Sequence, residues 1–242
     1  MINTFISRAK NIISHGSYIP TEYYISDKNE LVYIPIAKVA CTTLKIATLA
    51  NQDDYDLNKN SYMEVHKNAS DQKYLALPDH CQSYYKFAFV RNPFDRLVSC
   101  YEDKVKTPIQ HHGQYYFATN YNRTLIKRLF GNEFSPEMTF DDFVKLVHKI
   151  PDFLSDGHFK SQYSILYKKN KLTVDHIGKF ENIEKDWETI AKLKNLPSIS
   201  KKNTSIRKPW EDYYKSDEII KIVVDRYKND FEYFEYDKHL KT

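Results

Sequence analysis

The stretch KFAFVRNPFDRLVSCYEDK, residues 86–104, changes character once, at Arg91. Before this residue the chain has the length and the aromatic, β-branched content of a buried strand. After it, apolar side chains recur with the i, i+3, i+4, i+7 spacing of an amphipathic helix: Phe94, Leu97, Val98 and Tyr101. The stretch therefore predicts a strand, a very short turn and a helix.

The residues around the turn indicate where that helix begins. Asn92 suits the N-cap, and Pro93 suits the first helical position, where a missing N–H costs nothing. Asp95 then falls in the first turn, where a carboxylate interacts favourably with the helix dipole. Arg91 is thus placed at the carboxyl end of the strand, which is the edge of an open α/β sheet where ligands bind.

An earlier part of the chain has the same order of strand, turn and helix. Leu31–Ile36 has the composition of a strand, and the helix after it is expected to run towards Ala50. Either Thr42 or Thr43 is expected to cap that helix. Lys38 lies in the turn between the two elements, where a phosphate-binding loop would carry its lysine.

The turn at Lys38 has the chemistry of an anion site. Backbone N–H groups at a helix N-terminus attract an anion, and Lys38 adds a formal positive charge. The glycines of the Walker A pattern, G-x-x-x-x-G-K-[ST], are missing, so the turn is not a Walker A loop. The small residues Ala40 and Cys41 would still let the backbone approach a phosphate. Taken alone, the turn is also consistent with a surface lysine ahead of a capped helix.

The rest of the chain continues the alternation of strands and helices. The further elements expected are a helix capped by Thr139, a helix around Phe159–Tyr167, a strand through Ile177 with a turn at Gly178, helices over Ile183–Lys194 and Asp217–Tyr227, and a packed aromatic tail at Phe231, Phe234 and Tyr236. Such alternation predicts an α/β fold with a central parallel sheet and helices on both faces. No linker divides the chain, so a single domain over residues 1–242 is expected.

Composition excludes several classes of protein. Lys and Arg number 36 against 32 Asp and Glu, and they are scattered, which falls short of a nucleic-acid-binding signature. Three cysteines without C-x-x-C spacing favour neither a disulfide framework nor a zinc site. The N-terminal stretch lacks the apolar run of a signal peptide or membrane anchor, so a cytoplasmic location is expected.

Taken together, the two turns resemble a known family. Lys38 with Thr42 and Thr43 after one strand, and Arg91 with Ser99 after the next, resemble the phosphate-binding elements of sulfotransferases that use 3′-phosphoadenosine 5′-phosphosulfate. The segments KVACTTLK and VRNPFDRLVSCYEDK are most similar to those of carbohydrate sulfotransferases that modify chondroitin and dermatan. The resemblance therefore implies the P-loop NTPase-like fold of this family.

The resemblance continues in order through four further segments, MTFDDFVKLV, DGHFKSQYSIL, DHIGKFENIEKDW and YKNDFEYFEY. It covers roughly Val32 to Tyr236. One departure lies in the first loop, where Pro35 precedes Lys38 by three residues instead of one. The other is the missing N-terminal membrane anchor of the Golgi enzymes, which bears on compartment and on the specific polymer.

The resemblance implies transfer of a sulfuryl group from this donor to a hydroxyl of a carbohydrate, without a metal. Lys38 would neutralise the charge that the departing phosphate gains, and Arg91 would meet the 3′-phosphate with two hydrogen bonds. Arg96 would serve either the fold or the ligand. The donor-binding residues implied are Lys38, Ala40, Cys41, Thr42, Thr43, Arg91, Ser99, Arg207 and Lys208.

The acceptor hydroxyl needs a proton acceptor, for which histidine is the natural choice. His66 resembles a family histidine ahead of the second strand, and His80 and His158 are its rivals.

Two other functions fit the same turns. One is a P-loop-like kinase or nucleotide hydrolase, against which the missing glycines and the lack of a metal-binding acidic pair count. The other is a nucleotide-binding module that has lost catalysis.

Overall fold

The computed structural model describes residues 21–49, 73–107, 116–117, 123–131, 133–199 and 207–240. These residues form two compact units, each assembled from separate segments of the chain. The sheet unit comprises the described residues of Pro20–Arg91 and Ser164–Ile206, and the helical unit those of Asn92–Tyr163 and Arg207–Thr242. The single domain over residues 1–242 stays a prediction. No helix in the described ranges is long and apolar enough to cross a membrane.

The sheet unit contains a five-stranded sheet with the order β3-β1-β2-β4-β7. The strands are β1 (Tyr23–Ser26), β2 (Leu31–Tyr33), β3 (Lys73–Tyr74), β4 (Tyr85–Val90) and β7 (His176–Lys179). Neighbours β2, β4 and β7 are parallel, as predicted, whereas β1 is antiparallel to both β2 and β3. The sheet is therefore mixed, with three parallel strands at its centre and far edge. A separate hairpin joins β5 (Tyr167–Lys168) to β6 (Lys171–Leu172).

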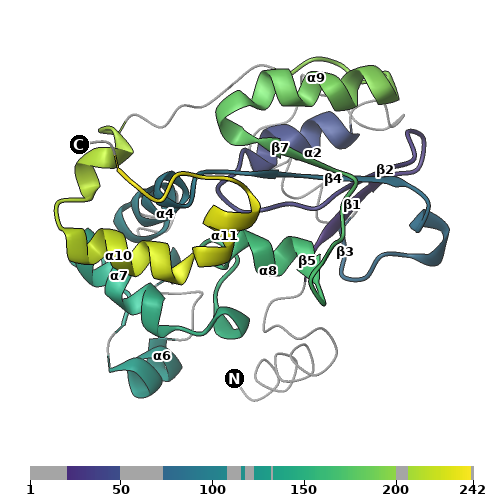
Figure 1. The fold of residues 1–242 in the computed structure, drawn as a ribbon. Coiled ribbons are helices and arrows are strands. Elements are labelled where there is room, and N and C mark those ends of the chain that lie inside the picture. The colour runs from purple at the N-terminus through teal and green to yellow at the C-terminus, as the bar shows by residue number, and fades with distance from the viewer. Residues whose placement is uncertain are drawn as a thin grey trace. The chain divides into compact units, whose positions relative to one another are not determined.

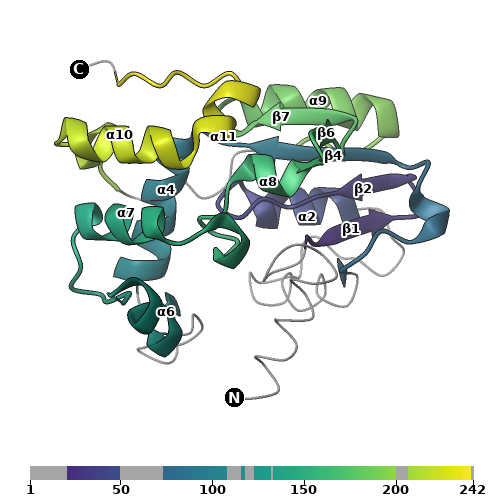
Figure 2. The ribbon, with the colours of Figure 1, turned by 60° about the horizontal axis from the view of Figure 1, so that its bottom comes forward.

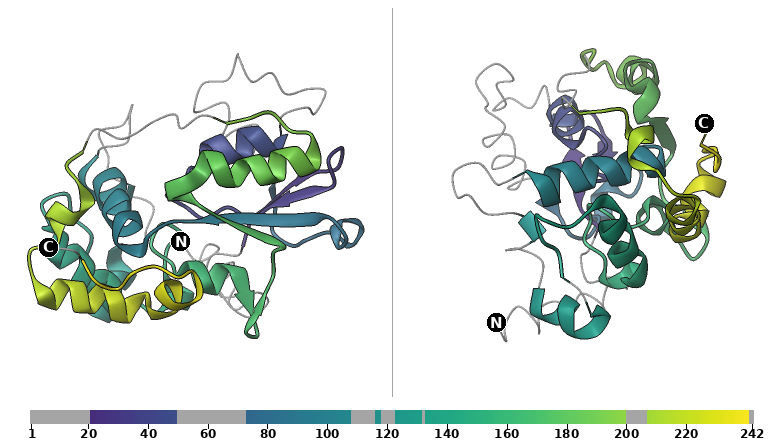
Figure 3. Two further views of the ribbon diagram at one scale, coloured as in Figure 1. Left: turned by 45° about the horizontal axis from the view of Figure 1, so that its top comes forward. Right: turned by 90° about the vertical axis from the view of Figure 1, so that its left-hand side faces the viewer.

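Helices flank this sheet, as the sequence predicts. Both α2 (Cys41–Leu49) and α9 (Ile183–Lys194) lie on one face (Figures 1 and 3). The end of α8 (Gln162–Leu166), from Ser164 onwards, lies on the other face (Figure 2). Because β2 and β4 are parallel, the loops that follow them leave the sheet at the same edge.

Aromatic side chains fill the core of the sheet unit, and one of them, Phe89, explains why glycine occupies position 178. Tyr33 stacks on Phe87 at a ring-centroid distance of 5.1 Å, and Trp187 meets Phe87 edge-on at 5.8 Å. The prediction of a turn at Gly178 is wrong, because β7 continues through this residue to Lys179. A Cβ atom at Gly178 would lie 2.3 Å from the nearest ring atom of Phe89, so only glycine fits beside that ring.

Replacing Gly178 by alanine is expected to lower the free energy of unfolding by about 1–3 kcal/mol, as other cases of overpacking do. The added methyl group can be accommodated only by moving the fully buried Phe89 ring. Urea denaturation of the two proteins measures this difference. Gly157→Ala is the matched control, because nothing lies within 4 Å of its Cβ position. Equal losses in both variants would contradict the packing account.

The helical unit consists of helices and turns. Its helices are α4 (Pro93–Tyr101), α6 (Arg123–Phe130), α7 (Phe140–Lys149), the start of α8, α10 (Asp217–Arg226) and α11 (Lys228–Tyr233). A π-helical turn, η2 (Glu102–Lys106), continues α4 directly. Short 3-10 turns are η3 (Asp152–Leu154) and η5 (Trp210–Tyr213) here, and η1 (Asp79–Cys81) and η4 (Phe180–Asn182) in the sheet unit. Helix α10 packs along α7 (Figures 1 and 2).

Aromatic side chains hold the helical unit together. The centroid of the Phe94 ring lies 5.0 Å from the ring centroids of both Tyr214 and Phe231. The Tyr214 hydroxyl also donates to the Phe94 carbonyl at 2.9 Å. Phe231 and Phe234 are buried. The predicted packing of the C-terminal aromatic residues is therefore confirmed for these two side chains, and Tyr236 packs partly buried against the same cluster.

Two helix starts predicted from capping residues, those at Asn92 and Thr139, are confirmed. The Asn92 side chain accepts a hydrogen bond from the backbone of Phe94, with Pro93 at the first helical position. Thr139 caps α7 through the backbone N–H of Asp142. Helix α9 also has the predicted bounds.

Other predicted bounds are too long. Strand β2 ends at Tyr33, although the Ile34 N–H still donates to the Phe87 carbonyl at 3.0 Å. Pro35 has no N–H to continue this pairing, so the predicted strand to Ile36 is too long. Helix α8 is likewise shorter than predicted, and α10 ends one residue early, at Arg226.

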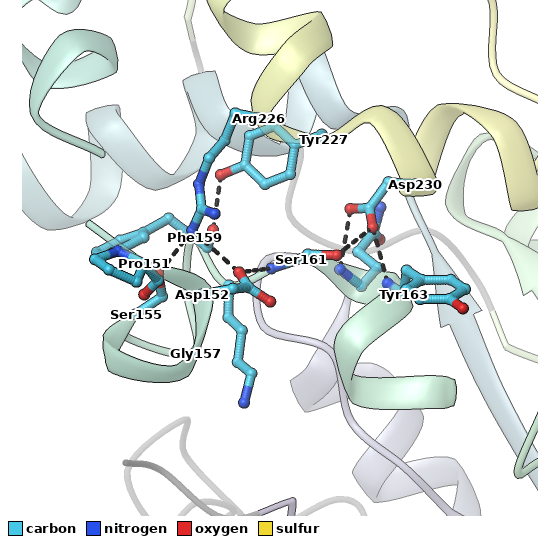
Figure 4. A network of polar contacts seen from close by, with 12 residues as sticks. Pro151, Asp152, Ser155, Gly157, Phe159, Ser161, Tyr163, Arg226, Tyr227 and Asp230 are labelled. Atoms are coloured by element: carbon cyan, nitrogen blue, oxygen red, sulfur yellow. Dashed lines mark hydrogen bonds and ion pairs between the residues drawn. The ribbon is translucent and has the colours of Figure 1, made fainter. Parts of the chain in front are cut away.

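Buried polar groups fix the loop from Pro151 to Ser161 (Figure 4). Asp230 accepts hydrogen bonds from the Ser161 hydroxyl at 2.7 Å and from the backbone N–H groups of Gln162 and Tyr163 at 2.9 and 2.8 Å. Burial raises the pKa of Asp230, and these hydrogen bonds limit the rise. On the other side of the loop, Arg226 donates to Asp152 at 3.0 Å. The loop that carries His158 is therefore held at both ends.

Candidate functional site

The turn after β2 adopts the backbone conformation of a glycine-rich loop without its glycines. Lys38 has φ +69° and Ala40 has φ +48°, both in the left-handed region that favours glycine. The Val39 N–H donates to the Ile36 carbonyl at 3.2 Å and closes the turn. Left-handed non-glycine residues cost about 1–3 kcal/mol each and occur most often at functional sites. The turn can therefore take the conformation of an anion-binding loop, although the Walker A glycines are missing.

Helix α2 begins at Cys41, earlier than the sequence predicts. Thr42 and Thr43 therefore lie within the first turn, and the prediction that one of them caps the helix is wrong, because Ala40 occupies the position before the helix. The Cys41 thiol donates to the Ile36 carbonyl at 2.8 Å and ties the helix start to the end of the strand region. The first turn of α2 has no acidic residue, so no carboxylate of its own neutralises the positive end of the helix dipole.

Arg91, at the end of β4, contacts the turn that holds Lys38. Its Nη1 donates to the Lys38 carbonyl at 2.9 Å, and its guanidinium carbon lies 4.2 Å from the centroid of the Phe180 ring. The side chain is buried, with 7% exposed. The structure therefore brings Arg91 and the Lys38 turn together within the sheet unit. Sequence reasoning missed Phe180, which follows β7 at the same edge of the sheet.

The predicted site residues on α4 have different surroundings. Ser99 is partly exposed on α4, two turns after Asn92. Arg96 is 2% exposed and donates to the carbonyls of Lys160 and Gly157 at 2.8 and 3.0 Å. Of the two roles open to Arg96, the structure thus supports the one in the fold, because both bonds hold the loop that carries His158.

Arg207 and Lys208 are both engaged within the helical unit. The Arg207 guanidinium forms an ion pair with Asp95 in the first turn of α4. The Lys208 ammonium lies 4.1 Å from the centroid of the Tyr213 ring and 3.4 Å from the Asp212 carbonyl. Contact between either residue and a nucleotide stays a prediction.

The three candidate histidines differ in their surroundings. His66 lies outside the described residues. His80 is exposed, and its Nε2 lies 3.2 Å from Asp27 Oδ1. His158 is largely buried, and its Nδ1 lies 2.5 Å from Oδ1 of the buried Asp156. Of these two described candidates, His158 has the closer and more buried carboxylate partner, an arrangement that can orient a catalytic imidazole.

Asp156 is held as an anion in this pair. Burial alone would raise its pKa, but the charge and hydrogen bonds of His158 together outweigh burial, so the pKa of Asp156 lies below its usual range. The His158 backbone N–H also donates to the same carboxylate oxygen, at 2.9 Å. The Tyr116 ring meets the imidazole edge-on at 4.9 Å. The spacing D-x-H in DGHFK was the signal in the sequence that sequence reasoning did not use.

Asp156→Asn is expected to destabilise the protein at pH 7 and to lose this effect in acid. The folded-state pKa of Asp156 is lowered from an ordinary value of about 3.9. Its ionised form therefore contributes stability that is fully present above about pH 4 and is lost as pH falls through the folded pKa. Denaturation of both proteins between pH 7 and 3 measures the difference. A difference that does not shrink in acid would contradict the ionised Asp156 carboxylate as its source.

Several known proteins have sequences similar to that of this chain. A family model described as "Sulfotransferase family" matches residues 21–237. Carbohydrate sulfotransferase 11 from Rattus norvegicus is 25% identical over 216 residues, which cover 82% of this chain and 59% of that protein. Carbohydrate sulfotransferase 9 from Homo sapiens is 26% identical, covering 76% and 43% respectively. For carbohydrate sulfotransferase 14 from Mus musculus, the identity is 28% and the coverage 72% and 46%.

The chain thus spans about half the length of the relatives it matches, from 43% to 59% for these three. No solved structure matches it.

Proposed function

Because this chain belongs to the sulfotransferase family, we propose that it transfers a sulfuryl group from 3′-phosphoadenosine 5′-phosphosulfate to a hydroxyl of a carbohydrate. The observation that carries the proposal is the contact of Arg91 with the Lys38 turn, because it joins two cationic turns at one edge of the sheet. The acceptor class rests on the names of the relatives, which are carbohydrate sulfotransferases.

The residues of the Lys38 turn fit the 5′ end of this nucleotide. When bound, the nucleotide supplies the sulfuryl group and a phosphate leaving group. The left-handed residues Lys38 and Ala40 turn the backbone towards the start of α2, where N–H groups attract an anion. Thr42 and Thr43, in the first turn of α2, add hydroxyl donors. The Lys38 ammonium then stabilises the charge that develops on the leaving phosphate.

Arg91 has two roles in this proposal. It positions the Lys38 turn through the carbonyl of that residue, and it meets the 3′-phosphate. A guanidinium carries five N–H donors, so one bond to a carbonyl is compatible with a second contact to a phosphate. Ser99 is proposed to add a hydroxyl donor to the same phosphate.

We assign the proton acceptor to His158. With Nδ1 held by Asp156, the acceptor position of the imidazole is Nε2, which suits removal of a proton from a sugar hydroxyl. His66 is the alternative that the sequence favours. The absence of any metal from the transfer step and the cytoplasmic location both stay predictions.

A transfer assay with ³⁵S-labelled donor and a panel of oligosaccharides tests the proposal. Label is expected to reach a carbohydrate hydroxyl in the presence of EDTA. Transfer of phosphate from ATP that depends on Mg²⁺ would instead identify a kinase or hydrolase. Tight binding of the nucleotide with no transfer to any member of the panel would favour the module that has lost catalysis.

Arg91→Ala is expected to weaken the binding of adenosine 3′,5′-bisphosphate by about 10- to 100-fold. Hydrogen bonds to charged groups contribute about 1.5–3 kcal/mol, and this variant loses such bonds as well as the support of the Lys38 turn. Calorimetric titration measures the affinity. Arg128→Ala, at an exposed position of α6, is the control and is expected to bind normally. An unchanged affinity of Arg91→Ala would remove Arg91 from the nucleotide site.

A further inference from the structure

Three side chains with metal-binding atoms meet in the sheet unit, away from the turns described above. Asp27 follows β1, and His80 and Cys81 belong to η1. One donor atom from each residue lies within 4.8 Å of the other two. Asp27 Oδ1 is 3.2 Å from His80 Nε2 and 4.0 Å from Cys81 Sγ.

A carboxylate oxygen, an imidazole nitrogen and a thiolate sulfur are the ligand types of zinc. With zinc–ligand bonds of about 2.0–2.3 Å in tetrahedral geometry, neighbouring ligand atoms lie about 3.3–3.7 Å apart. The distances from Asp27 to His80 and Cys81 lie close to this range, so small side-chain movements would complete the geometry.

The surroundings support these three residues as ligands. The Tyr84 hydroxyl donates to Asp27 Oδ1 at 3.1 Å and so steadies the carboxylate, as outer-shell groups do at metal sites. The backbone N–H of Cys81 donates to the Pro78 carbonyl at 3.1 Å, which fixes η1. Cys81 is buried, whereas the side chains of Asp27 and His80 are 65% and 60% exposed. The cluster thus has a buried thiol and a side open to solvent.

Hydrogen bonding alone accounts for only part of this cluster. His80 and Tyr84 contact Asp27 at hydrogen-bond distances, but a thiol at 4.0 Å is a weak donor at best. A metal ion would engage all three candidate ligands.

We propose that Asp27, His80 and Cys81 bind one Zn²⁺ ion, with water as the fourth ligand. Binding exchanges the thiol proton of Cys81 for the metal, and the proton goes to solvent. The ligands lie before β2 and β4, at the amino ends of these strands, whereas Lys38 and Arg91 follow their carboxyl ends. The ion therefore links the β1–β2 turn to η1 and takes no part in sulfuryl transfer.

Titration of the untagged full-length chain with Co²⁺ tests this site, because a thiolate ligand gives Co²⁺ an intense charge-transfer absorption in the near ultraviolet. We expect one ion per chain, displacement by Zn²⁺, and a rise in melting temperature when Zn²⁺ is added. Cys81→Ala is expected to abolish the absorption. Cys100→Ala is the matched control, because both cysteines are buried with 0% exposed, and it is expected to retain the absorption.

Variants of the exposed ligands keep the test decisive should Cys81→Ala fail to fold. Asp27→Asn and His80→Gln are expected to weaken Zn²⁺ binding by more than the 10- to 100-fold typical of outer-shell losses. Absence of Co²⁺ binding, absorption that survives in Cys81→Ala, or unchanged affinity in both exposed-ligand variants would overturn the proposal.

Discussion

His158→Ala is expected to lower kcat for sulfuryl transfer by about 10²–10⁴-fold, the range that a positioned general base contributes. The affinity for adenosine 3′,5′-bisphosphate should stay unchanged, because the variant removes a proton acceptor and no phosphate contact. Steady-state kinetics at saturating donor and acceptor measure kcat, and calorimetry measures the affinity. An unchanged kcat in this variant, together with loss of activity in His66→Ala, would transfer the role to His66.

Two further variants, at Asp156 and at His148, test whether His158 acts in catalysis or only supports the structure. Asp156→Asn keeps the size of the side chain but removes the carboxylate that orients Nδ1, so kcat should fall while KM changes little. His148 also lies beside a carboxylate, with Nδ1 3.9 Å from Asp225, but this pair is on the surface. His148→Ala is therefore the matched control and should retain wild-type kcat.

Local signals in the sequence predicted the elements whose ends are set by single residues. Asn92 and Thr139 start helices where expected. A helix cap depends on one side-chain oxygen that accepts from one nearby backbone N–H, so a few neighbouring residues in the sequence are enough to predict it. Gly178 was misread because glycine marks turns in most sequences. Here glycine is required because the Phe89 ring of the neighbouring strand, 89 positions away in the chain, leaves no room for a side chain.

The sequence predicts that Lys38 and Arg91 lie at one edge of the sheet, but it does not predict their contacts or the neighbouring Phe180. Lys38 and Arg91 follow neighbouring parallel strands, so their meeting at one edge of the sheet follows from topology. The hydrogen bond from Arg91 to the Lys38 carbonyl depends on the left-handed backbone of that turn. A lysine in the sequence does not predict this conformation. The pairing of Asp95 with Arg207 joins residues 112 positions apart, and nothing local to either residue predicts it.

The second large effect is expected at Lys38, where charge and backbone can be tested separately. Lys38→Ala should lower kcat by about 10²–10³-fold, the loss typical when one group that stabilises a developing negative charge is removed. Donor affinity should fall less, because the charge on the leaving phosphate is greatest in the transition state. Single-turnover kinetics and calorimetry measure the two quantities.

Lys38→Gly distinguishes the ammonium from the strained backbone that carries it. Glycine accepts φ +69° without cost, so this variant should be more stable than Lys38→Ala by about 1 kcal/mol while losing as much kcat. Lys192→Ala, at an exposed position of α9, controls for the loss of a positive charge and should retain activity. Near-normal kcat in Lys38→Gly would show that Lys38 acts through the shape of the turn, and leaving-group stabilisation would then have to come from another group.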